Sequence, residues 1–133
     1  MKGALASLFV MALTMLSSCG KGGINGKLDG MLQIMTIERL ADGNVSHPDQ
    51  KYIDIYLHTV NLASYGGVRH TANMYRDEEE NKMSLEFPYQ ASDPSVLSPW
   101  GIYTAEVTFV IEKVNGKELV LRSPDAILTL RRF

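Results

Sequence analysis

The chain has 133 residues, a formal net charge of −2 and one cysteine, and 45% of its residues are hydrophobic. This length suits a single domain with its own core. The weakly acidic balance argues against a nucleic-acid-binding protein, which needs a basic patch to neutralise phosphates. One cysteine leaves no partner for a disulfide within the chain or for a zinc site built from several thiolates.

The N-terminus has the pattern of an export signal. Lys2 supplies a positive charge, and the apolar stretch from Ala4 to Leu16 follows it. As a helix this stretch reaches only about 20 Å, short of the ~30 Å hydrocarbon core of a bilayer. It ends in Leu16-Ser17-Ser18-Cys19, which resembles the lipobox of bacterial lipoproteins. We therefore expect residues 1–18 to be a cleaved signal peptide and Cys19 to carry a lipid; a buried, unmodified cysteine is the alternative.

A glycine-rich segment follows the cysteine. Residues 19–27 read CGKGGINGK, a composition typical of a flexible tether. In lipoprotein sorting, as the resemblance implies it, Gly20 after the cysteine favours the outer membrane. No acidic run of the kind that sends some lipoproteins to the cell surface follows Cys19. The expected location is the outer membrane facing the periplasm, with the cell surface as the alternative.

Residues 28–133 have the pattern of strands and turns that is typical of an all-β domain. Short apolar or alternating runs are separated by turn residues, and no stretch has the period of a long amphipathic helix. Asn115-Gly116 between two such runs predicts a hairpin with a type I′ turn. An eighth strand is left open within the irregular stretches. The seven expected strands are Met31–Ile37, Tyr52–His58, Val68–Arg76, Lys82–Tyr89, Tyr103–Val114, Lys117–Arg122 and Ala126–Phe133.

The stretch GKLDGMLQIMTI from Gly26 to Ile37 and the final LTLRRF resemble small lipocalin-like lipoproteins of Bacteroidetes, mostly domains of unknown function. The resemblance implies an up-and-down antiparallel β-barrel of about eight strands, although a sandwich remains the alternative. Lipocalins open with Gly-x-Trp, and here Gly30-Met31-Leu32 lacks the tryptophan. Arg131 or Arg132 is the counterpart of their late arginine, and their C-terminal helix is missing.

A closed barrel of this size either is filled by side chains or holds one small ligand. The apolar residues on the inner faces of three strands are candidates for the ligand site, and they are equally the residues of an ordinary core. Trp100 joins them because its loop is placed to cover the barrel mouth. The candidate ligand-binding residues are Ile53, Ile55, Leu57, Met83, Leu85, Phe87, Trp100, Val107, Phe109 and Ile111.

Catalytic and metal-binding motifs do not stand out. His47, His58 and His70 are scattered without metal-ligand spacing, and Asp77–Glu80 lacks the alternation and glycine of a calcium loop. There is no nucleophile elbow, P-loop or dinucleotide fingerprint. We expect no enzyme, no cofactor and no metal.

With an enzyme not expected, two functions remain open. The first, which the sequence favours, is a membrane-anchored, lipocalin-like protein that binds a small apolar or amphipathic ligand in the bacterial envelope. The second is a structural or interaction lipoprotein with a filled barrel that docks another envelope protein. The strand face with Tyr52, Tyr56 and His58 suits docking, because tyrosine is favoured at interfaces. A persistent cavity separates the two functions.

Overall fold

The computed structural model describes residues 26–133 of the chain. The expected signal peptide, Cys19 and nearly all of the expected tether lie outside the described residues. Within them, no helix is long and apolar enough to cross a bilayer. The elements in chain order are η1 (Gly26–Leu28), β1 (Gly30–Arg39), β2 (Val45–Ser46), β3 (Lys51–Tyr56), β4 (Thr59–Ser64), β5 (Arg69–Asp77), β6 (Lys82–Glu86), η2 (Pro88–Gln90), η3 (Pro94–Trp100), β7 (Glu106–Val114), β8 (Glu118–Arg122) and β9 (Ala126–Arg132), where η denotes a 3-10 helix.

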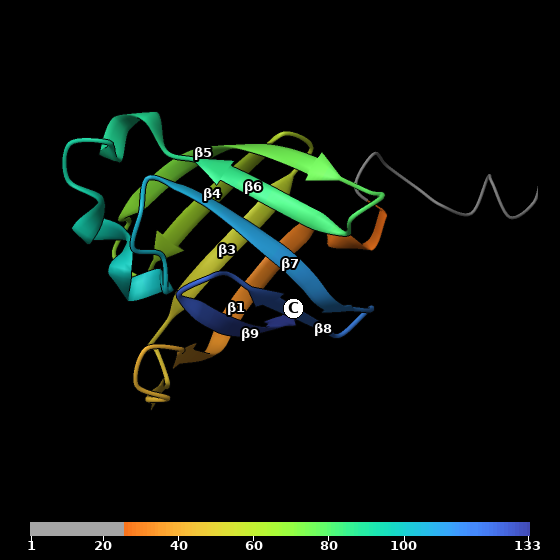
Figure 1. Ribbon diagram of the computed structural model, residues 1–133, viewed down its shortest axis with the longest axis horizontal. Helices are drawn as coiled ribbons and strands as arrows, with labels where there is room; N and C mark the ends of the chain where they lie inside the picture. Colours follow the sequence, from red (N-terminus) through yellow and green to blue (C-terminus); the bar gives the residue numbers. More distant parts are fainter. Residues whose placement is uncertain (1–25) are drawn as a thin grey trace, which may run out of the picture.

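The strands form a closed, up-and-down antiparallel barrel (Figure 1). Each long strand pairs with the next along the chain, and β1 pairs with both β3 and β9, so the ring closes with eight strands. The two-residue strand β2 adds to one end of β1, opposite Ile37 and Glu38. The expected barrel is confirmed, and the alternative of two packed sheets is wrong.

The sequence missed strand β4. The expected strand Tyr52–His58 ends at Tyr56, and the chain turns back through Leu57 and His58. Leu57 has φ +55°, a left-handed conformation that a leucine seldom adopts. The turn contains no glycine, proline or asparagine, so composition gave no sign of it. The alternation of buried Val60 and Leu62 marks β4 once the turn is known.

The hairpin at Asn115-Gly116 is confirmed, but its predicted turn type is wrong. Neither residue has a positive φ, which a type I′ turn requires at both. Instead the Asn115 side-chain Oδ1 accepts hydrogen bonds from the backbone N–H groups of Lys117 and Glu118, each at 2.8 Å. The asparagine therefore forms the turn through its side chain.

One cluster of buried apolar side chains occupies the barrel. Leu28 in η1 packs into it at one end, and Leu97 and Trp100 in η3 pack into it at the other. Figure 1 shows η1 and η3 at opposite ends of the barrel. Gly101, with φ +78°, follows Trp100, and a Cβ there would lie 2.5 Å from Cδ2 of Leu128. The closing segment thus packs too tightly on the barrel to admit a side chain at this position.

Candidate functional site

The barrel interior is filled by the side chains that the sequence proposes as a ligand site. The most exposed of the strand residues among them, Val107, is 8% exposed, and Met83, Leu85 and Phe109 are 0–2% exposed. A ligand-sized space would leave its lining accessible to a water-sized molecule, and these side chains are not accessible. The candidate residues buried in this core are Ile53, Ile55, Met83, Leu85, Phe87, Trp100, Val107, Phe109 and Ile111. Leu57 is not with them, because it lies half-buried in the β3–β4 turn.

Trp100 lies in the segment that closes one end of the barrel. Its indole Nε1 donates a hydrogen bond of 3.0 Å to the carbonyl of Ala63 at the end of β4. The His70 ring meets the indole edge to face at 5.4 Å, and the Lys51 ammonium lies 5.9 Å from its centroid. Together with buried Leu97, the indole fastens η3 across the ends of β3, β4 and β5.

Arg132 holds chain segments together at the opposite end of the barrel, where η1 lies. Its guanidinium donates to the carbonyls of Lys27, of Asp29 at 2.8 Å and of Asn115 at 3.0 Å. Burial lowers the pKa of this guanidinium, and the charge of Asp29 acts in the opposite direction. A Cβ at Gly30 would lie 3.1 Å from Nη1 of Arg132, so the glycine makes room for the arginine.

Of Arg131 and Arg132, the two candidates for the late arginine that the resemblance implies, Arg132 is the half-buried one. It pairs across the β1–β9 ladder with Leu32, the residue that stands where the resembled family has its tryptophan. Arg131 instead points outward and donates to Gln33 Oε1 at 2.9 Å. Alternation along the strand sends the two arginines to opposite faces.

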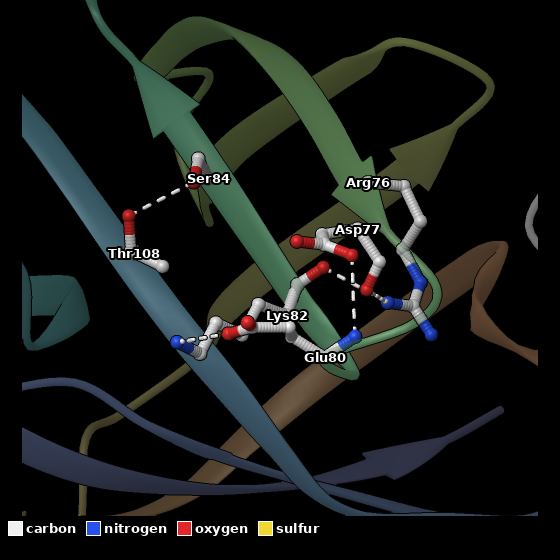
Figure 2. A network of polar contacts seen from close by, with 6 residues as sticks. All are labelled: Arg76, Asp77, Glu80, Lys82, Ser84 and Thr108. Atoms are coloured by element: carbon white, nitrogen blue, oxygen red, sulfur yellow. Dashed lines mark hydrogen bonds and ion pairs between the residues drawn. The ribbon is translucent and has the colours of Figure 1, made fainter.

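A hollow of about 420 Å³ lies on the outer wall across β5, β6 and β7. Ser84 and Thr108 line it and share a hydrogen bond of 2.8 Å (Figure 2). Beside them Glu86 lies directly opposite Glu106 in the ladder. None of the ion pairs found in residues 26–133 involves either glutamate. The hollow is lined by Tyr75, Ser84, Leu85, Glu86, Glu106, Val107 and Thr108.

The acidic run at the β5–β6 turn is tied into local contacts. Figure 2 shows Arg76 and Lys82 on either side of this turn. Arg76 donates to the carbonyl of Lys82 at 2.9 Å, and the backbone N–H of Glu80 donates to Asp77 Oδ1 at 3.2 Å. The Lys82 ammonium lies 2.9 Å from Glu80, and this hydrogen bond and charge raise the pKa of Lys82. Within residues 26–133, no three His, Cys, Asp or Glu side chains are grouped to hold a metal.

His58 and His70 do not meet. The carbonyl of His58 accepts a hydrogen bond from the N–H of Met74 near the end of β5, whereas His70 pairs with Leu62 near its start. The two histidines therefore lie toward opposite ends of the same strand pair.

Exposed apolar side chains gather on the outer wall where β1 runs between β3 and β9. Met31 is 42% exposed, Tyr56 66% and Phe133 73%. The ring of Phe133 lies 5.7 Å from that of Tyr52, which joins the chain's last residue to β3. We call Met31, Tyr52, Tyr56 and Phe133 the β1 face. Its two tyrosines were expected on one strand face; Met31 joins them through the β1–β3 pairing, and Phe133 joins them through closure of the barrel by β1 and β9.

A family model described as a lipocalin-like domain matches residues 14–133. The fold is similar to the crystal structure of a lipocalin-like protein from Bacteroides uniformis, with a TM-score of 0.68 and 18% identity over 81% of this chain and 100% of that chain. It is also similar to that of an uncharacterized protein from Bacteroides eggerthii, with a TM-score of 0.62 and 16% identity over 79% of this chain and 98% of that chain. No curated protein matches the sequence. At these identities the structural likeness concerns the fold alone.

Proposed function

We propose that this chain, which belongs to the lipocalin-like domain family, is an interaction lipoprotein: a filled barrel, held at the outer membrane by lipid on Cys19, that docks another envelope protein. The apolar segment and Leu16-Ser17-Ser18-Cys19 support the anchor. In this proposal the protein has no catalytic role and needs no cofactor.

The filled interior is the observation that carries the proposal. The side chains on the inner strand faces are closely packed, and η1 and η3 close the two ends of the barrel. Entry of a ligand would require the Trp100 segment to leave and core side chains to separate. A partner is therefore met on the outside of the barrel, where no rearrangement of the core is needed.

The barrel end that carries η3 is the part of the surface that we assign to this partner. Tyr65 in the β4–β5 turn and Tyr89 in η2 are each 84% exposed, and Val68 is 50% exposed. Tyrosine and apolar side chains of this kind are enriched at protein interfaces. This end lies opposite η1, where the chain enters from the anchor, so it points away from the point of attachment (Figure 1).

A second candidate function is binding of a small apolar or amphipathic ligand inside the barrel. Membership of a lipocalin-like family favours it, and Met74 and Met83 in the core have the flexible thioethers that adapt to varied ligands. It requires an open state of the barrel in addition to the filled one described here.

Native mass spectrometry distinguishes the two candidates. Residues 20–133 contain the whole closed barrel without the lipidated cysteine, and they would be incubated with total envelope lipid extract. We expect the mass of the bare chain alone, because the interior has no ligand-sized space. A discrete added mass that persists after removal of free lipid would contradict the filled-barrel proposal and support the second candidate.

A further inference from the structure

We propose that the β1 face rests on the membrane surface, so that the barrel lies with β1 toward the lipid and β6 away from it. This inference rests on the proposed anchoring through Cys19. It assigns to a lipid surface the tyrosine face that the sequence suggested for a protein partner.

The β1 face has the chemistry of the interface between lipid and water. It combines a methionine and a phenylalanine with two tyrosines, whose rings are apolar and whose hydroxyls stay hydrated. Its members are adjacent on the wall, because Met31 pairs with Asp54 between Tyr52 and Tyr56, and Phe133 contacts Tyr52. The face is therefore a continuous exposed strip rather than scattered side chains.

The chain outside the described residues determines which surface this strip meets. Residues 19–25 reach at most about 25 Å when fully extended and less as a flexible coil. The next residue, Gly26, is the first residue of η1. Arg132 fixes η1 by donating to the carbonyls of Lys27 and Asp29. Met31 follows at the start of β1, so a lipid on Cys19 holds the β1 face within reach of the bilayer at high effective concentration.

The charges around the barrel agree with this orientation. Arg131 and Lys27 are exposed near the β1 face and can reach lipid phosphates, while the half-buried Asp54 is the carboxylate within the face. The acidic run Asp77–Glu80 joins β5 to β6, and β6 lies halfway round the ring from β1. The carboxylates of the outer-wall hollow on β6 and β7 also face away from an anionic surface.

The test measures the depth of a tryptophan in vesicles. Residues 1–133 would be expressed in a bacterial host, and the processed protein reconstituted into phosphatidylethanolamine vesicles that contain brominated phosphatidylcholine. Phe133→Trp places the probe in the β1 face, and Tyr89→Trp places a matched control on an exposed aromatic position at the other end. Both variants keep buried Trp100 as a common background.

We expect bromine to quench the added fluorescence of F133W at least twofold more than that of Y89W. Equal quenching of the two, or stronger quenching of Y89W, would overturn the proposed orientation. Crosslinks between Phe133 positions of two molecules without quenching would also overturn it, since a second copy would then cover the face.

A second preparation shows whether a negative result means that Cys19 carries no lipid or that the β1 face does not meet the bilayer. The intact mass of the processed protein shows whether Cys19 is acylated, and an unmodified Cys19 would contradict the proposed function. In that case residues 19–133 would be coupled through Cys19 to a maleimide lipid, and the same quenching comparison would still decide whether the β1 face meets the bilayer.

Discussion

Arg132 joins three separate parts of the chain through one side chain. Its guanidinium donates to carbonyls of Lys27 and Asp29 before β1 and of Asn115 in the β7–β8 turn. Desolvation is costly for a cation, and these carbonyls replace part of the lost water, while the charge of Asp29 also favours the charged guanidinium. The arginine thereby fixes the end of the barrel at which the proposed tether enters.

Arg132→Ala is expected to lower the free energy of unfolding by about 2–3 kcal/mol, because it removes hydrogen bonds made by a charged group and leaves the carbonyls of the half-buried Asp29 and Asn115 without this donor. Arg131→Ala is the matched control, since Arg131 is exposed and its guanidinium donates to the side chain of Gln33. Its expected loss is at most about 0.5 kcal/mol. Urea unfolding of both variants measures the difference; losses of equal size would contradict the role given to Arg132.

At the level of elements, the β6–β7 pair places two acidic residues directly opposite each other. Glu86 and Glu106 are direct cross-strand neighbours, whereas Arg122 of β8 has an ion pair with Glu112 of β7 at 3.3 Å. Like charges directly opposite each other destabilise a sheet. The hydrogen-bonded Ser84 and Thr108 beside them stabilise the same pair of strands.

Glu106→Gln is expected to raise the free energy of unfolding by roughly 0.2–1 kcal/mol at low salt, because it removes this repulsion. Added salt should shrink the gain by screening the charges in the wild-type protein. Glu112→Gln, which breaks an exposed ion pair, should leave stability unchanged or lower it slightly. Thermal unfolding at two salt concentrations provides the comparison, and a loss of stability in E106Q would contradict the repulsion.

Local patterns in the sequence predicted most strands but not all of their connections. Alternation placed Met83, Leu85, Val107 and Phe109 on inner faces because a strand has a period of two. Strand β4 was missed because the chain turns at Leu57 and His58, neither of which is a typical turn residue, with Leu57 in a left-handed backbone conformation. Consecutive strands with short turns predicted a closed barrel, but the register of the closing β1–β9 pair lay beyond local patterns, since these strands stand at opposite ends of the domain.

At the scale of the whole molecule, the candidate functional site moves from the interior of the barrel, where the sequence predicted it, to the outer surface. The sequence identified the inner residues, but whether they enclose a cavity depends on how side chains from eight strands meet, which no single strand reveals. The β1 face depends equally on closure, because it brings Phe133 onto Tyr52. The central claim that follows is that the barrel is filled and acts through its outer surface.

Ala72→Leu tests this claim most directly. Ala72 is fully buried on the inner side of β5, opposite Val60, so a larger side chain must enter the barrel. In a filled interior it should lower the free energy of unfolding by about 1–3 kcal/mol through overpacking. Asn73→Leu, at the exposed neighbouring position, controls for leucine on the same strand. A clear loss in A72L but not in N73L is the predicted outcome of equilibrium unfolding, and unchanged or increased stability in A72L would reveal a cavity and contradict the account.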